Sequence, residues 1–258
     1  VKEELDLHKA GHFGTLDPNA TGVLPVALNR STRINEALAG ADKQYVFEAV
    51  FQQSFPEEEL KEVLKKFKGT NTQMPPEKSA VKREERQREM YSQELIEAEG
   101  DRMLARIDVE SGFYVRVLID QIAEELGTEG EMEELRRTSQ GSIGEEELVT
   151  LQELVDAYHY YKEDGDEEKL LEAVQPMERG VNHLRKIVIK DSAVNAVANG
   201  ADLGAQGISK YQDGISEGEM VAIMTLKGEL VALATAEMNS EEMFDSGETA
   251  ATLESVHM

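Results

Sequence analysis

The sequence contains no cysteine and no tryptophan. Without cysteine the chain has no disulfide bonds, no thiolate metal ligands and no cysteine nucleophile. No apolar run approaches the roughly 18 residues of a membrane-spanning helix. The N-terminus reads Val1-Lys2-Glu3-Glu4 and lacks the basic and then apolar pattern of a secretory signal. The sequence therefore predicts a cytoplasmic protein that does not enter a membrane.

Basic residues are also scarce, with 27 lysines and arginines against 52 acidic residues among 258, a net charge of −25. Such acidity argues at first sight against binding nucleic acid, which attracts cations. The excess is spread along the chain: residues 1–180 hold 22 basic and 40 acidic residues, and residues 181–258 hold 5 and 12. Evenly spread acidity resembles that of proteins from salt-loving organisms. Because the Debye length at molar salt is about 3 Å, an RNA substrate is not excluded if the protein is halophilic.

Residues 7–34 interrupt this pattern, since Asp17 is their one carboxylate. The same window keeps Lys9, Arg30 and Arg33. A stretch with a single acidic residue in an otherwise acidic protein is expected to face a negatively charged partner. The alternative is burial of an apolar segment such as 23–26, and the two are compatible.

Hydrophobic periodicity predicts the main elements of the first 180 residues. Alternation predicts strands at 44–52 and 102–110. Apolar stripes predict helices over 56–68 and 115–126, the second ended by Gly127, and a capping box at Thr150 opens a helix to about Tyr161. The polar, proline-containing stretch 71–92 is interpreted as a long connection with a basic cluster.

The sequence pattern changes near Arg179–Val181, where a second domain is predicted to begin. Residues 186–190 form a predicted strand, and Asp191-Ser192 is expected to cap a short helix ending at Asn199-Gly200. Strands at 219–226 and 229–237 flank a two-residue turn, Lys227-Gly228. The tail from Asn239 is polar and acidic. These short strands predict a small β-rich module.

The segment from Gly11 to Pro25 carries the clearest chemical signal. Its glycines allow tight turns, and Pro18 stiffens the chain directly after Asp17. The result is a rigid loop that presents one carboxylate. The alternative is that Asp17-Pro18 only begins a turn, which is the commoner use of this dipeptide.

Residues 9–34 closely resemble the signature of the TruB/dyskerin family of RNA pseudouridine synthases, and further motifs agree in order along nearly the whole chain. Residues 181–258 resemble the family's C-terminal PUA domain, at 191–194 and 200–203, and the similarity is closest to archaeal members. The other matching segments are Lys43-Gln44-Tyr45, Pro75 to Lys82, Gly112 to Arg116 and Leu135 to Thr138.

The resemblance implies an α+β fold, with a mixed, mainly antiparallel sheet flanked by helices and then a small β-rich domain. The expected domains are 1–180, the catalytic domain, and 181–258, the PUA RNA-binding domain. Family members carry a strand with a Lys-Pro motif before the signature, so the chain is expected to be N-terminally truncated.

By resemblance, Asp17 is the catalytic nucleophile, and Arg116 is the arginine that pairs with it and keeps it charged under RNA. Tyr45 is the tyrosine that stacks on the target base. The reaction breaks a uridine's glycosidic bond, turns the base and rejoins it through carbon five. It needs no metal and no cofactor. The alternatives are an ordinary surface ion pair for Arg116 and a core position for Tyr45.

Other matching positions are expected to bind RNA. His12 is expected to contact RNA beside the flipped base, although a lone histidine is more often structural, and Lys43 and Leu135 are expected to line the pocket. The predicted phosphate contacts, for which a solvated charged face is the alternative, are Lys78, Lys82, Arg83, Arg136 and Arg137.

The predicted function is therefore an RNA pseudouridine synthase. Its substrate is the T-loop uridine of tRNA, uridines in rRNA chosen by an H/ACA guide RNA, or both, and small ribonucleoprotein partner proteins are expected with the guide. A non-catalytic RNA-binding scaffold is the alternative. A cation-binding protein is a third hypothesis, but Asp164-Gly165-Asp166 is only a fragment of a calcium loop.

Overall fold

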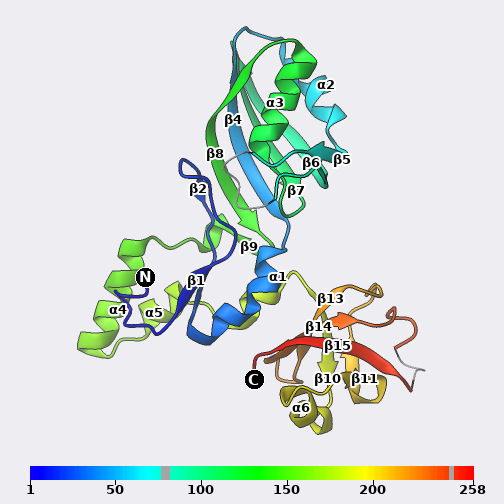
Figure 1. Ribbon diagram of the computed structural model, residues 1–258. Coiled ribbons are helices and arrows are strands. Elements are labelled where there is room, and N and C mark those ends of the chain that lie inside the picture. Colours follow the sequence, from blue (N-terminus) through cyan, green and yellow to red (C-terminus); the bar gives the residue numbers. More distant parts are fainter. Residues whose placement is uncertain (77–81, 244–246) are drawn as a thin grey trace. The chain divides into compact units, whose positions relative to one another are not determined.

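The computed structural model describes residues 1–76, 82–243 and 247–258 (Figure 1). The chain forms two compact units. The first unit comprises Val1–Phe13, Pro25–Ala39 and Leu148–Met258, and the second comprises Gly14–Leu24 and Gly40–Glu147. Among the described residues, no helix is long and apolar enough to cross a membrane.

The second unit is built on a seven-stranded sheet in the order β2-β8-β4-β7-β6-β5, with β9 paired to β8. The pairing of β2 with β8 is parallel, and the other pairings in this sheet are antiparallel. The strands are β2 (Thr21–Gly22), β4 (Lys43–Phe51), β5 (Gly69–Gln73), β6 (Arg86–Glu99), β7 (Arg102–Val109), β8 (Gly130–Gln140) and β9 (Ile143–Gly144).

Two helices, α2 (Glu57–Lys66) and α3 (Val115–Leu126), pack against this sheet (Figure 1). Alternate residues of β4, including Phe47 and Phe51, face their apolar stripes and form one core. Gly127 ends α3 with a φ of 67°, in the left-handed region that favours glycine. A short 3₁₀ helix, η2 (Glu145–Glu147), follows β9.

The first unit contains a six-stranded sheet in the order β11-β15-β14-β13-β10-β12. The pairing of β10 with β13 is parallel and the others are antiparallel. Its strands are β10 (Arg185–Ile189), β11 (Leu203–Gly204), β12 (Ile208–Tyr211), β13 (Met220–Met224), β14 (Leu230–Ala236) and β15 (Thr249–Val256), with α6 (Asp191–Ala198) and η4 (Ala205–Gly207).

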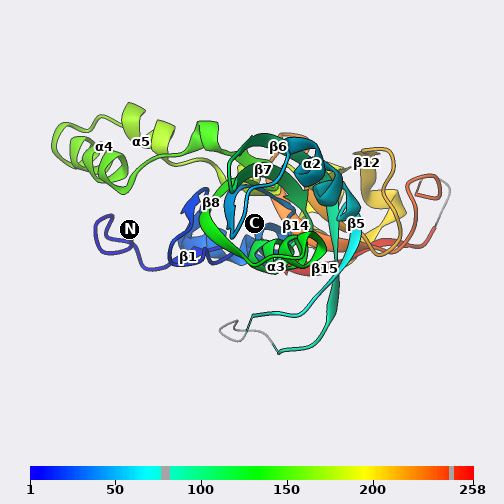
Figure 2. The same cartoon turned by 90° about the horizontal axis from the view of Figure 1, so that it is seen from above.

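The rest of the first unit is a two-stranded ribbon and several helices, of which α4 is the longest. Helices α4 and α5 lie side by side in both views (Figure 1 and Figure 2). The elements are β1 (Ala10–His12), β3 (Val26–Leu28), η1 (Asn29–Ile34), α1 (Asn35–Ala39), α4 (Leu151–Asp164), α5 (Glu168–Ala173) and η3 (Met177–Val181).

Most predicted elements are confirmed, including the two strands and two helices expected at 44–52, 102–110, 56–68 and 115–126. The Thr150 capping box is also confirmed, with hydrogen bonds exchanged between Thr150 and Glu153. The interpretation of 71–92 as a connection is wrong at both ends, which belong to β5 and β6. The sequence hides β6 because only one of its residues, Met90, is buried, so its apolar alternation is weak.

Three predictions in the C-terminal region are corrected. The tail contains β15, whose buried residues Ala250 and Ala251 are small and poor strand formers. The loop between β13 and β14 spans five residues, 225–229, instead of two. Asp191 lies inside α6, whose N-cap residue is Lys190.

Candidate active site

Asp17 lies in the loop that joins β1 to β2. Its carbonyl accepts a hydrogen bond of 2.9 Å from the N–H of Ala20, which closes a tight turn with Pro18 in the second position. The turn expected from Asp-Pro is therefore present. The side chain of Asp17 is 51% exposed, so the loop presents the carboxylate to the outside.

Arg116, the second residue of α3, pairs with this carboxylate. Its Nη2 lies 3.1 Å from Oδ2 of Asp17, and both side chains are about half exposed. Exposed ion pairs contribute about 0–1 kcal/mol to stability. A cation in the first turn of a helix also opposes the helix dipole. The pair therefore contributes little to the stability of the fold, and the predicted role of Arg116 beside Asp17 stays a prediction.

Tyr45 lies on β4, between Ile107 of β7 and Arg137 of β8. It is partly buried, and burial is the main cause that raises the pKa of its hydroxyl. The nearby Arg137 guanidinium lowers this pKa, and the charge of Asp17 raises it. Tyr45 therefore presents a neutral phenol within the electrostatic reach of the Asp17 carboxylate.

Arg137 holds the Asp17 loop on the sheet. Its side chain is only 1% exposed. Its Nε donates to the carbonyl of Val23 at 2.7 Å, and its Nη2 donates to the carbonyl of Gly14 at 2.9 Å. The carbonyl of Arg137 in turn accepts from the N–H of Val23 at 2.7 Å. One residue of β8 thus binds the loop on both sides of Asp17.

The phosphate contact of Arg137 stays a prediction, and the burial of its side chain argues against it. A guanidinium that is buried and bonded to two carbonyls is not presented to RNA. The signal that would have found this is the alternation of β8, which places Arg137 on the same buried face as Leu135 and Arg136 on the opposite face.

Gly22 is the second residue whose role in the site was not predicted from the sequence. It pairs with Arg137 across the parallel β2–β8 contact and has a φ of +97°. A Cβ at this position would lie 2.1 Å from the carbonyl oxygen of Arg137. Only glycine allows the loop to approach β8 this closely.

Lys43 and Leu135 lie in the same unit and are both buried. The Nζ of Lys43 donates to the carbonyl of Ala41 at 2.5 Å and to Oγ of Ser111 at 3.0 Å. Burial first, and then the charge of Arg137, lowers the pKa of Lys43 to about 8, while Asp42 opposes the shift. Leu135 is 8% exposed and belongs to the hydrophobic core.

The remaining predicted contacts are distributed over both units. His12 is exposed at the end of β1, in the first unit. In the second unit, Arg136 pairs with Glu145 and Lys82 with Glu84, and Arg83 is exposed. Lys78 lies outside the described residues. Their phosphate contacts stay predictions.

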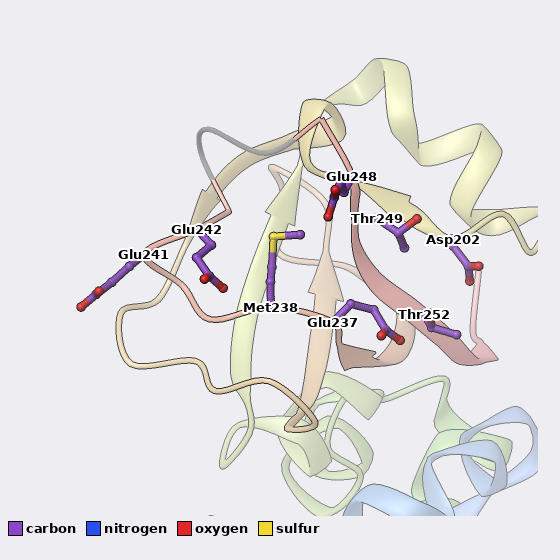
Figure 3. A pocket seen from close by; sticks show the side chains of 8 residues that line it. All are labelled: Asp202, Glu237, Met238, Glu241, Glu242, Glu248, Thr249 and Thr252. Carbon is purple, nitrogen blue, oxygen red and sulfur yellow. The ribbon is translucent and has the colours of Figure 1, made fainter.

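The first unit contains an open pocket that none of the predicted site residues lines (Figure 3). Carboxylates dominate its walls, so it does not suit phosphate. The lining residues are Asp202, Glu237, Met238, Glu241, Glu242, Glu248, Thr249 and Thr252. Within the described part of the chain, no group of three or more acidic, histidine or cysteine residues has the geometry of a metal site.

Family profiles match three consecutive parts of the chain. They are the TruB family pseudouridylate synthase (N terminal domain) at residues 2–115, the tRNA pseudouridylate synthase B C-terminal domain at 116–182 and the PUA domain at 185–256.

Curated relatives agree with these profiles. The probable tRNA pseudouridine synthase B of Pyrococcus abyssi is 52% identical over 246 residues, which cover 95% of this chain and 74% of the relative. The protein of the same name from Methanocaldococcus jannaschii is 46% identical over 100% of this chain and 77% of its own length.

Solved structures agree as well. A chain from the crystal structure of a Cbf5-Nop10-Gar1 complex matches with a TM-score of 0.96 and 50% identity, covering 100% of this chain and 79% of its own. A chain from an H/ACA RNP bound to a substrate RNA containing 2′-deoxyuridine matches with a TM-score of 0.91, 47% identity and coverages of 100% and 78%. With this fold, these relatives and the Asp17 loop in place, the chain belongs to the TruB family of pseudouridylate synthases.

Proposed function

We propose that the chain is an RNA pseudouridine synthase and that Asp17 is its nucleophile. The observation that carries this proposal is the Asp17–Arg116 pair, at 3.1 Å, on a loop that Arg137 binds to β8 beside Tyr45. A positioned, ionised carboxylate can form a covalent intermediate with a sugar or a base. Arg116 pairs with this carboxylate through its guanidinium.

The reaction is an isomerisation that balances within the substrate. The bond between N1 of uracil and C1′ of ribose breaks, the base turns, and a bond between C5 and C1′ forms. The proton on C5 is lost, and N1 gains one. Extracting the base from its stack costs a few kcal/mol. Stacking on Tyr45 would recover about 1–3 kcal/mol.

We propose two sources of substrate. The relatives named tRNA pseudouridine synthase B support a uridine of tRNA, taken here as the T-loop uridine. The matching chains from Cbf5-Nop10-Gar1 and H/ACA RNP structures support rRNA uridines chosen by a guide RNA, with small partner proteins.

The family profiles at 116–182 and 185–256 support a catalytic domain of residues 1–180 and an RNA-binding PUA domain of 181–258. The proposed RNA substrates support a cytoplasmic location.

The test is tritium release from RNA that carries tritium on carbon five of uridine, at molar potassium chloride, first on tRNA alone. Asp17→Asn should lower the rate by at least about 10³-fold, because removing a nucleophile costs most of the catalysis. The matched control is Asp101→Asn, an exposed aspartate of the same unit in the turn between β6 and β7.

If tRNA alone gives no release, the assay is repeated with guide RNA and the small partner proteins. Release that depends on Asp17 in either assay supports the proposal. Release that survives Asp17→Asn contradicts the role of Asp17. RNA binding without release in both assays would favour the scaffold function.

A further inference from the structure

Gln73, the last residue of β5, is a polar side chain with only 1% of its surface exposed. Its amide forms two hydrogen bonds with one residue, Tyr114. Nε2 donates to the carbonyl of Tyr114 at 3.1 Å, and Oε1 accepts from the N–H of Tyr114 at 2.8 Å. Both halves of the amide are therefore used, which fixes its orientation.

Tyr114 is the residue from which α3 starts. It is the N-cap of the helix, and its own side chain makes no capping hydrogen bond. Its carbonyl also accepts the first helical bond, from the N–H of Leu118 at 3.1 Å. Helix starts leave backbone groups that need partners. Here Gln73, on the neighbouring strand, accepts from one of these groups, the N–H of Tyr114, so the start of α3 is held to the sheet.

Arg116 follows Tyr114 by two residues, on the first turn of this helix. The Asp17–Arg116 pair is half exposed, and its attraction of about 0–1 kcal/mol is too weak to set its own geometry. The two backbones must therefore set it. The backbone around Asp17 is held to β8 by Arg137, and the backbone before Arg116 is held to β5 by Gln73.

We propose that Gln73 is a positioning residue for the pseudouridine synthase reaction, acting through Tyr114 on the place of the Arg116 guanidinium. This inference rests on the proposed function of Asp17 and Arg116. Gln73 touches neither substrate nor reacting atoms. The competing explanation is that Gln73 only stabilises the fold.

A double-mutant cycle separates these two explanations. Gln73→Leu removes both hydrogen bonds, and it is compared in the wild-type background and in the Arg116→Ala background. The matched control is Gln121→Leu, which removes a different bond between α3 and β5, from Nε2 of Gln121 to the carbonyl of Thr72 at 3.0 Å. That bond lies later in α3 and leaves the start of the helix intact.

Misplacing a catalytic group by 1 Å can cost about 10²-fold in rate. We expect Gln73→Leu to lower kcat by about tenfold or more, with KM changed by less than about threefold. In the Arg116→Ala background the further loss should be under about twofold, because the group that Gln73 positions is gone. Gln121→Leu should lower kcat by less than about twofold. The same loss from Gln73→Leu in both backgrounds would overturn the proposal.

Gln73→Glu is the second variant, in case the leucine variant does not fold. The two side chains have nearly the same size, but an ionised glutamate keeps the acceptor and loses the donor to the Tyr114 carbonyl. Protonation restores a donor, so the ratio of variant to wild-type kcat should rise as pH falls. A ratio that stays flat between pH 8 and pH 5 while kcat is reduced would contradict the proposed contact.

A spectroscopic measurement works without turnover. The Nε–H signal of Arg116 in ¹⁵N-labelled protein, assigned with Arg116→Lys, should move in Gln73→Leu toward its position in Asp17→Asn. An unchanged signal in a folded Gln73→Leu protein would overturn the inference. If wild-type protein proves inactive, the proposed function fails, and this signal still reports whether Gln73 positions Arg116.

Discussion

Gly22 is the residue at which the Asp17 loop comes closest to the sheet. A methyl group there would meet the carbonyl oxygen of Arg137 at 2.1 Å, and the φ of +97° disfavours any other residue. We expect Gly22→Ala to push β2 away from β8 and to lower kcat by at least about tenfold, since small displacements of catalytic groups are costly. Tritium release and thermal unfolding would measure the two effects.

Gly100→Ala is the control for that substitution. Gly100 lies in the same unit with a φ of +64°, but nothing lies within 4 Å of its would-be Cβ. Gly100→Ala should lower the free energy of unfolding by about 1 kcal/mol, the cost of the backbone strain alone. It should leave the activity unchanged. If both variants lose activity equally, the close approach of Gly22 to Arg137 is not what matters.

Lys43 makes stability depend on pH. Its pKa falls from 10.5 to about 8 on folding, chiefly through burial. Between these two values the unfolded chain binds more protons than the folded one, so stability rises as pH increases through this window. Below pH 8 the Lys43 amine is protonated in both the folded and the unfolded chain. The folded chain then bears the full free-energy cost of burying that charge.

Lys43→Met removes this titration. The free energy of unfolding of wild type minus that of the variant should increase between pH 8 and pH 10.5, by at most about 3 kcal/mol. Denaturant titrations at constant salt would measure it. A difference that stays constant over this range would show that the pKa of Lys43 is not lowered.

At the scale of single elements, α4 shows what local chemistry contributes. Its N-terminus carries a full capping box, with the N–H of Glu153 bonded to Oγ1 of Thr150 at 3.2 Å and the N–H of Thr150 bonded to Oε2 of Glu153 at 2.7 Å. Thr150→Ala should lower the free energy of unfolding by about 1 kcal/mol. Thr150→Ser, which keeps the hydroxyl, should lose less than half of that, and equal losses would show that the hydroxyl bond contributes nothing.

The elements that sequence reasoning predicted are those whose signal is local. Alternation in β4, an apolar stripe in α3 and the Thr150 box can each be identified within about a dozen residues. Strands β5, β6 and β15 were missed because their apolar signal is weak: β5 has no apolar side chain, β6 buries only Met90, and the fully buried residues of β15 are two alanines.

The same difference between local sequence signals and contacts that are distant in sequence applies to the residues of the site. Asp17, Arg116 and Tyr45 were identified through motifs, and the structure brings them together in one unit. The positions of Arg137 and Gln73 in the site were not predicted. Each residue acts through a hydrogen bond to a backbone carbonyl that is distant in sequence. Strand alternation could have placed Arg137 on the buried face, but nothing local indicates that Gln73 reaches Tyr114.

At the scale of the whole molecule, the net charge of −25 opposes compaction. We propose that the protein is adapted to high salt, which screens this repulsion. Helical circular dichroism should be well formed at molar potassium chloride and weaken at about 50 mM. An uncharged osmolyte at matched osmolarity is the control, and it should restore less structure than the salt does. Full structure at low salt would argue against halophilic adaptation.

The bonds between Arg137 and the Asp17 loop also set when the proposed active site can first form during synthesis. Val23 and Arg137 are 114 residues apart, and the loop is made first. At about 5–20 residues per second, a ribosome needs roughly 6–23 s to travel between them. During that interval the nascent loop has no strand to bind. The loop can therefore take up its place on the sheet only after β8, the last long strand of that sheet, has emerged from the ribosome.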